Sequence, residues 1–487
     1  METIKTKQVA VLLGIFLFLE IISIFGFSFS FVNQSAFFIL VLITLVLSIY
    51  KLEYGLLLVL AELMIGSKGY LFYLPLGEGS LLSLRLVIWS ILMIVFLIKF
   101  LISLKKLGYE SPYFKKIKDF VFWKPYLILA ILVLTGLVSA IIYKNNLIDI
   151  FLDFNAWIYF LILFPAISVN INRQRLETIF IAGAIWISLK TLILLAIFSN
   201  DFTFAANVYA WLRKTLVGEM TASSNWNRVF IQSQIFSIIA YFFLFFKIIK
   251  INNLKSFFNK QNILNFVLMA LFFSTLLISL SRSLWLGFAA VILFSLIFTW
   301  RFYSFKRAAL IALEMTLGVV LAVIMIFVAA PHLTGLQSQL LNRVGNKEEA
   351  ALVSRWTLLP ELIKEIKNNP ISGQGYGKTV TYISSDPRIL ENEASGRYTT
   401  YAFEWGYLDI WLKIGVLGLI AYLLLLYKVI HASLMSGIKS GDYLYLGITA
   451  GCLFLAIVHF FTPYLNHPLG IGFIVISSCL ILKDRVY

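Results

Sequence analysis

Two arginines stand where long apolar segments of the sequence begin or end. Arg228 follows the polar stretch 223–227, and Arg282 lies in a Ser-Arg-Ser sequence with almost no loop between two apolar segments. A guanidinium is always charged, and its planar fork of donors suits the oxygens of a diphosphate. We therefore take both arginines as candidate anion-binding residues. The alternative for each is an interfacial cation that extends toward lipid headgroups.

Glu404 is the candidate general base. It directly precedes an apolar segment that begins at residue 405. A carboxylate that is partly removed from water has a raised pKa and can accept a proton from a reacting hydroxyl. The alternative is that its charge only stabilises the positive end of the helix that follows.

The elements that must position these residues are membrane helices. Hydrophobic residues make up 60% of the chain and charged residues 13%, and apolar runs of the roughly 20 residues that a span needs recur throughout. We predict an all-α polytopic membrane bundle of about 14 spans, within a range of about 12–14. The spans are expected at about 9–29, 36–50, 53–67, 81–99, 125–143, 151–169, 176–199, 226–246, 263–281, 284–300, 308–330, 405–428, 442–460 and 468–482.

Residues 331–404 form the one long polar interval. The pattern predicts an amphipathic helix over 350–368, a glycine-rich turn over 369–377 and a loosely structured arm that re-enters the membrane at 404–409. The predicted organisation is therefore an N-terminal transmembrane bundle (1–330), a loop (331–404) and C-terminal transmembrane helices (405–487).

Lysine and arginine are concentrated in alternate loops, which fixes the expected orientation. The cluster 99–124 and the cations near both termini fall on one side, and few cations fall on the other. Because cytoplasmic loops carry the positive excess, we expect both termini in the cytoplasm and the loop 331–404 outside the cytoplasmic (inner) membrane of the cell.

The same charge placement argues against several function classes. The net charge of +16 lies in short loops, where cations meet anionic lipid headgroups, so membrane lipids and not nucleic acid are the expected partners. No Walker A motif or dinucleotide fingerprint is found, and the histidines and carboxylates show no ligand spacing. We expect no nucleotide, metal or other cofactor.

Charged residues inside the predicted spans are functional hypotheses by default. Arg85 and Glu62 lie in the outer halves of their spans and can line one cavity, with a mutual ion pair as the alternative. Asp409 and Lys413 are four residues apart, which predicts a structural ion pair on one helix face.

Three segments, in this order, resemble the O-antigen ligase and O-antigen polymerase superfamily of bacterial membrane proteins. They are Ser281 to Gly287, similar to the family's Ser-Arg turn; Ser354-Arg-Trp with the helix and glycine turn that follow; and Gly406 to Gly418, similar to the family's re-entry into a span. Together they cover 280–418. Arg228 lies at the place of another family arginine.

The resemblance implies a glycan donor on a polyprenyl diphosphate, already on the outer side, and a glycan or lipid acceptor. Arg228 and Arg282 would stabilise the departing diphosphate, and transfer would invert the anomeric centre without a metal. Substrate-binding roles would fall to Arg355, Arg397, Arg85, Gly373, Gly375 and Gly377. Many ligases of the family carry His-Asn just before Tyr-Leu, where this chain has Glu404 and Trp405, so the base is a carboxylate or lies elsewhere.

We therefore expect a membrane glycosyltransferase that polymerises surface-polysaccharide repeats or ligates a glycan to an acceptor. A flippase for lipid-linked oligosaccharides would also bind diphosphate with arginines, but it would be expected to have broken helices and matched halves. A non-catalytic membrane receptor can also contain a large loop, but it does not require arginines at the ends of two spans.

Overall fold

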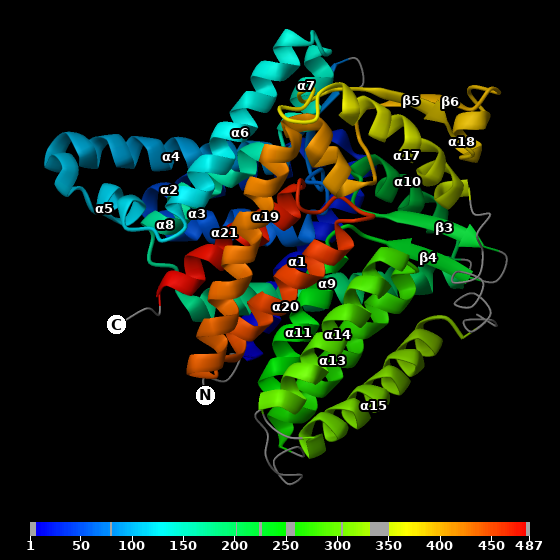
Figure 1. The fold of residues 1–487 in the computed structure, drawn as a ribbon. Coiled ribbons are helices and arrows are strands. Elements are labelled where there is room, and N and C mark those ends of the chain that lie inside the picture. Colours follow the sequence, from blue (N-terminus) through cyan, green and yellow to red (C-terminus); the bar gives the residue numbers. More distant parts are fainter. Residues whose placement is uncertain are drawn as a thin grey trace.

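The computed structural model describes residues 6–77, 80–200, 202–223, 226–249, 259–302, 305–331 and 350–483. This part of the chain is a bundle of helices with three two-stranded antiparallel hairpins (Figure 1). Within it, ten helices are long and apolar enough to cross a membrane. The predicted class, a helical multi-pass membrane protein, is confirmed, whereas the number of spans and their orientation stay predictions.

The longer helices follow the predicted spans closely. They are α1 (Thr6–Ser28), α2 (Ser30–Tyr50), α4 (Leu84–Leu107), α6 (Trp123–Ile142), α9 (Arg173–Ser199), α13 (Lys260–Ser279), α14 (Arg282–Phe302), α15 (Phe305–Ala329) and α19 (Gly406–Ser440). Shorter apolar helices are α3 (Leu52–Ile65), α11 (Gln234–Ile248), α20 (Tyr443–Val458) and α21 (Pro468–Lys483). Large apolar side chains stay exposed on the outer helices, including Phe18, Phe38, Ile128 and Val328, as expected where lipid covers the surface.

The remaining elements are shorter helices, 3-10 turns and strands. They are α5 (Pro112–Lys118), α7 (Leu147–Phe154), α8 (Leu163–Ser168), α10 (Ala205–Thr215), α17 (Ala350–Asn368) and α18 (Pro387–Leu390), with 3-10 turns at Gly108–Glu110 and Trp157–Ile162. The hairpins are β1 (Tyr73–Gly77) with β2 (Ser80–Ser83), β3 (Glu219–Ser223) with β4 (Trp226–Phe230), and β5 (Val380–Ile383) with β6 (Arg397–Thr400).

The polar interval is more ordered than its sequence indicates. The amphipathic helix is α17, with the predicted bounds, and the arm that was expected to be loosely structured contains β5, α18 and β6. A second, small core lies here: Leu358, Leu362 and Ile366 of α17 pack with Val380 and Leu412. The helix therefore packs onto β5 and the start of α19.

Two predicted spans differ from the structure. The span expected at 226–246 begins with strand β4, and its helix, α11, starts only at Gln234. Alternating apolar and polar residues on both sides of a polar turn favour this hairpin, and a hydropathy window averages over that alternation. The span expected at 151–169 is found as the candidate span Leu147–Ser168, but it consists of α7, a 3-10 turn and α8 in place of one helix.

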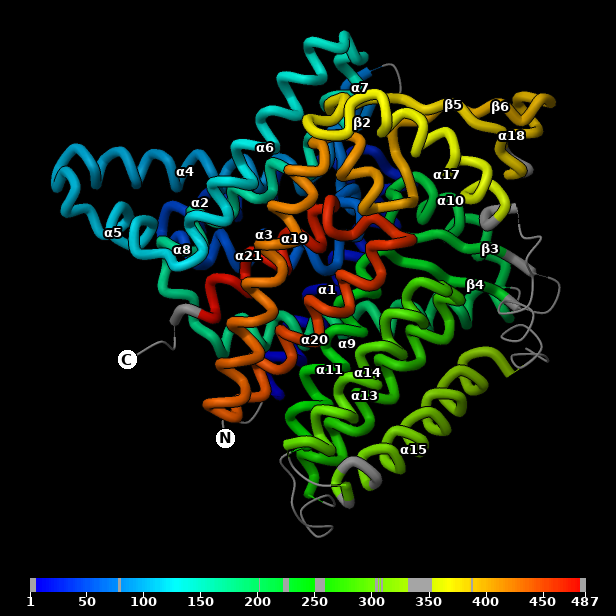
Figure 2. Tube along the Cα trace, viewed as in Figure 1, coloured from blue at the N-terminus to red at the C-terminus, as the bar shows by residue number. Residues whose placement is uncertain are grey.

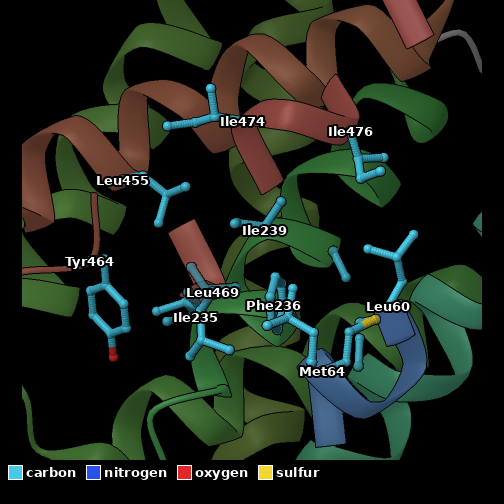
Figure 3. Packing of buried hydrophobic residues seen from close by; sticks show 14 of the residues in the cluster. Leu60, Met64, Ile235, Phe236, Ile239, Leu455, Tyr464, Leu469, Ile474 and Ile476 are labelled. Atoms are coloured by element: carbon cyan, nitrogen blue, oxygen red, sulfur yellow. The ribbon is translucent and has the colours of Figure 1, made fainter. Parts of the chain in front are cut away.

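Helix α11 is the centre of the core. All of its residues are buried, and it contacts α9, α13 and α20. Figure 3 shows Ile235, Phe236 and Ile239 of α11 packed among side chains of α3, α20 and α21. A helix that is apolar all round is stable only in such a position, so its two ends are held firmly by their neighbours.

Candidate functional site

The hairpin between α13 and α14 positions Arg282. Leu280 adopts a left-handed conformation (φ 44°), which ends α13, and Arg282 is already the first residue of α14. Ser283 forms a hydroxyl–hydroxyl hydrogen bond of 2.8 Å with Thr462. The half-buried Arg282 therefore lies at the apex of a tight helical hairpin that is tied to the loop between α20 and α21.

Strand β4 brings Arg228 to the same apex. The Nε of Arg228 donates a hydrogen bond of 2.8 Å to the carbonyl oxygen of Ser279, three residues before Arg282. Its guanidinium also lies 5.1 Å from the ring centroid of Phe230. The structure thus brings together the two arginines that sequence analysis selected, although Arg228 lies on a strand instead of the expected helix entry.

Glu404 lies at the start of α19 and forms an ion pair with Arg355 of α17. The Glu404 side chain is 51% exposed and that of Arg355 is 27% exposed, so the carboxylate is less removed from water than sequence analysis expected. Next to it, Trp405 donates a hydrogen bond of 3.0 Å to the carbonyl oxygen of Arg355 and packs on Trp356. Helix α17 therefore holds Glu404 and Trp405 in place directly before α19 begins.

The loop between α20 and α21 connects the carboxylate to the arginines. Phe461 packs against Trp405, with 5.6 Å between ring centroids, and its neighbour Thr462 bonds Ser283. Buried His459 accepts a hydrogen bond of 3.1 Å from the backbone N–H of Leu465, which shapes this loop from within. Glu404 and the arginine apex therefore flank one short segment, 461–462.

Two other predicted binding residues have different surroundings. Arg85 is 4% exposed and pairs with Glu62 through contacts of 2.9 and 3.2 Å, the ion pair that the sequence offered as an alternative. Arg397 is exposed on β6, opposite Ile383. Their proposed contact with substrate stays a prediction.

The three glycines of the turn 369–377 have a packing role. Gly373, Gly375 and Gly377 all have positive φ values of 75°, 84° and 71°. A Cβ on Gly375 would lie 2.1 Å from the backbone nitrogen of Ala140, and one on Gly377 would lie 2.6 Å from that of Ile150. The turn therefore sits directly against α6 and α7 (Figure 2).

The turn also closes a break in α19. Gly415 has non-helical angles (φ 71°, ψ 175°), so the carbonyls before it lack helical partners. The N–H of Gln374 donates to Leu412 (2.7 Å), and the N–H of Gly375 donates to Lys413 (3.1 Å). Within the described chain, the glycine turn thus takes over hydrogen bonds that an unbroken helix would make internally.

Near the turn, Glu365 of α17 is held in its charged form. Burial raises the pKa of this carboxyl group, but hydrogen bonds from Lys378 and Gln374 outweigh burial, and the net pKa is lowered. Because Lys378 and Gln374 lie on both sides of Gly375, this charged carboxylate helps to hold the turn against α17.

A buried charge cluster lies directly below the turn. Lys413 is 2.6 Å from Asp409 and 2.6 Å from Asp153, and Asn466 donates to Asp409. The predicted Asp409–Lys413 pair is confirmed. Asp153 was missed because it lies 260 residues from Lys413 in a segment taken as one uninterrupted span; its carboxylate within that apolar segment was the available signal.

Residues 267–423 match the family model described as O-Antigen ligase. The chain carries an O-antigen ligase domain. The matched residues span the α13–α14 apex, α17, the glycine turn and the start of α19, and so confirm the resemblance inferred from 280–418. No curated protein matches the sequence.

The O-antigen ligase domain includes Arg282, Arg355, Glu404 and the charge cluster on α19, whereas Arg228 and Asp153 come from the sequence before it. The matched segment is of the O-antigen ligase type, a family of membrane enzymes in surface-polysaccharide biosynthesis. Part of the candidate site is supplied by elements outside the matched segment.

The buried charge cluster predicts which of two variants, Lys413→Met or Asp153→Asn, is the less stable. Lys413→Met leaves two buried carboxylates without their cation and should cost roughly 3–5 kcal/mol, as for other broken buried pairs. Asp153→Asn keeps the Lys413–Asp409 pair and should cost less. Thermal unfolding in detergent measures both, with the exposed Lys439→Met as control. An Asp153→Asn variant that unfolds before Lys413→Met would contradict this order.

The close approach of the glycine turn to α6 predicts that two glycine-to-alanine variants differ in stability. Gly375→Ala and Gly77→Ala place alanine at similar positive φ values, 84° and 93°, but only the first adds a Cβ against backbone atoms; around Gly77 the space is open. Gly77→Ala should lower the stability by about 1 kcal/mol from backbone strain alone. Gly375→Ala should lower it much further and increase proteolysis between α17 and α19. Equal effects on the unfolding midpoint would mean that the close approach to Ala140 is unimportant.

Proposed function

We propose that the protein transfers a glycan from a polyprenyl-diphosphate donor to an acceptor hydroxyl on the extracytoplasmic face of the cytoplasmic membrane. The observation that carries this proposal is the convergence of Arg228 and Arg282 at one apex of an O-antigen ligase domain. Two guanidinium groups at the end of a membrane bundle suit a diphosphate whose hydrocarbon tail stays in lipid.

In the proposed reaction, Glu404 accepts the proton of the acceptor hydroxyl. The hydroxyl oxygen forms a bond with the anomeric carbon as the bond from that carbon to the diphosphate oxygen breaks. The diphosphate departs with the bonding electron pair, and attack opposite to it inverts the anomeric centre. Arg228 and Arg282 stabilise the charge that develops on the leaving group, and each such donor typically contributes about 10²–10³ in rate.

The ion pair with Arg355 supports the assignment of Glu404. The guanidinium of Arg355 fixes the orientation of this carboxylate through a charge-assisted contact. About half of the Glu404 side chain is exposed, so an acceptor can approach it from outside the bundle. Arg355 is then a positioning residue for the base.

Fixed guanidinium charges also explain how the proposed reaction proceeds without a metal. In many phosphoryl and glycosyl transfers a divalent cation neutralises the departing phosphate oxygens. Here Arg228 and Arg282 hold permanent charge at that position and need no proton exchange. The acceptor is a lipid core or a growing glycan, which corresponds to ligase or polymerase activity.

Arg282→Ala should lower the transfer rate by about 10²–10³. The measurement uses purified protein with a polyprenyl-diphosphate glycan and an acceptor, and follows the glycosylated product. Arg301→Ala is the matched control, because Arg301 is exposed in the last turn of the same helix, α14. Full activity of Arg282→Ala would overturn the proposed role of the apex.

Glu404→Gln should bind the donor normally and turn over about 10²–10⁴ times more slowly, because the amide keeps the shape but cannot take the proton. Donor binding and single-turnover transfer are measured on the same preparation. Normal turnover would remove Glu404 as the base. Loss of donor binding would instead assign the Glu404–Arg355 pair to substrate binding.

The break in α19 at Gly415 is the one observation that favours a flippase, since transporters place broken helices at their binding sites. The two functions differ in whether a covalent bond forms. Product formation in detergent, where there are no two sides to connect, supports the transferase. Movement of the labelled donor across vesicles without any product supports the flippase.

A further inference from the structure

A cavity of about 380 Å³ lies between α3, α9, α11, α20 and α21, separate from the candidate site. None of Arg228, Arg282, Arg355 and Glu404 lines it. Most of its wall is apolar: Leu63, Phe236, Phe243, Leu244, Ile476 and Leu480 contribute to it. The polar side chains gather at one end, where α9 and α20 begin and α11 ends.

At the polar end, most groups already have partners. Arg173 donates to Asp442 (2.6 and 2.9 Å) and to Glu177 (2.7 Å). The hydroxyl of Tyr443 donates to the second oxygen of Glu177 at 2.9 Å. Both oxygens of Glu177 are therefore engaged, and these residues form a closed ionic network.

Lys247 is attracted electrostatically by Glu177 of this network but is not bonded to it. It lines the cavity and is 7% exposed, yet its ammonium group has no hydrogen bond or ion pair with any residue that the structure describes. Its contact there is the ring of Tyr443, 5.7 Å from the nitrogen to the centroid. A buried ammonium with three unused donors is costly unless an anion joins it, so Lys247 points to a negatively charged ligand.

The length of the cavity indicates what else the ligand carries. Phe236 and Lys247 both line it and lie 11 residues apart on α11, which corresponds to about 16 Å along the helix. This is about half of a 30 Å hydrocarbon core, the depth of one leaflet. An acyl chain that starts at the level of Lys247 therefore matches the apolar wall in length and chemistry.

The polar end faces away from the candidate site. The start of α11 bonds back to β4, since the amide of Gln234 donates to the carbonyl oxygen of Val229, next to Arg228. Lys247 lies at the opposite end of the same helix. The polar end of the cavity therefore lies toward the leaflet opposite the arginine apex, which is the cytoplasmic leaflet in the expected orientation.

We propose that this cavity is a binding site for an anionic phospholipid, with its phosphate at Lys247 and one acyl chain along α11. The chemistry required is a phosphate joined to a hydrocarbon chain that is about one leaflet long. The occupant we assign is a diacyl phospholipid of the leaflet that Lys247 faces, not the polyprenyl donor at the other end of the bundle.

The test uses the full-length protein, stripped of lipid in detergent and titrated with dioleoylphosphatidylglycerol, dioleoylphosphatidylcholine, undecaprenyl phosphate or inorganic phosphate. Native mass spectrometry counts the bound molecules. We expect one phosphatidylglycerol per chain, bound at least tenfold more tightly than phosphatidylcholine. Equal affinity for these two lipids would overturn the proposal, as would tighter binding of undecaprenyl phosphate or equally tight binding of inorganic phosphate.

Variants test the assigned cation. Lys247→Gln should weaken phosphatidylglycerol binding at least tenfold, and Lys247→Arg should retain it. Lys439→Gln removes an exposed cation from the end of α19, just before Tyr443 of the cavity wall, and should leave binding unchanged. Unchanged binding by Lys247→Gln would overturn the proposal. If that variant does not fold, the lipid selectivity of the unaltered protein decides the question.

Discussion

The ammonium group of Lys413, buried between the carboxylates of Asp153 and Asp409, is the interaction on which the candidate site depends. Such a group is tolerated inside a membrane bundle only with partners at hydrogen-bond distance. It joins α7, α19 and, through Asn466, the loop before α21. The same short region carries the break at Gly415, where backbone groups must also find partners away from water. The glycine turn supplies them, so charge and backbone constraints are met together.

The same elements also position the candidate site formed by Arg228, Arg282, Arg355 and Glu404. The glycine turn fixes the C-terminal end of α17, and the ion pair with Glu404 fixes Arg355 in its N-terminal half. The loop between α20 and α21 is anchored at two points: Asn466 bonds Asp409, and Thr462 bonds Ser283. An enzyme that stabilises a leaving group with fixed charges needs such rigidity, because displacement by about 1 Å can cost two orders of magnitude in rate. Residues 350–404 of the polar interval are therefore packed against the membrane helices.

Local patterns predicted much of this protein. The amphipathic helix, the glycine turn and the apex at Arg282 each depend on adjacent residues, and their positions agree with the sequence analysis. Contacts between distant residues were not predictable in the same way. Asp153 of α7 reaches Lys413 across 260 residues of sequence, and Arg228 reaches the apex on a strand that a hydropathy window assigns to a helix. The packing role of Gly375 and Gly377 was likewise not predictable, because it depends on backbone atoms of α6 and α7.

The cations of this bundle differ in how deeply they are buried and in the groups that they contact. Lys190 pairs with Glu20, Arg85 with Glu62, and Lys413 with two aspartates, all deep in the protein. Each pair cancels a charge that the membrane would otherwise penalise, which is sufficient reason for its presence. Arg228 and Arg282 instead lie half-buried where helices end, and Lys247 lies at the other end of α11 beside a cavity. Within α11 the charged residue is Lys247, one residue before the helix ends. At the other end of the helix, Gln234 bonds to the strand that carries Arg228.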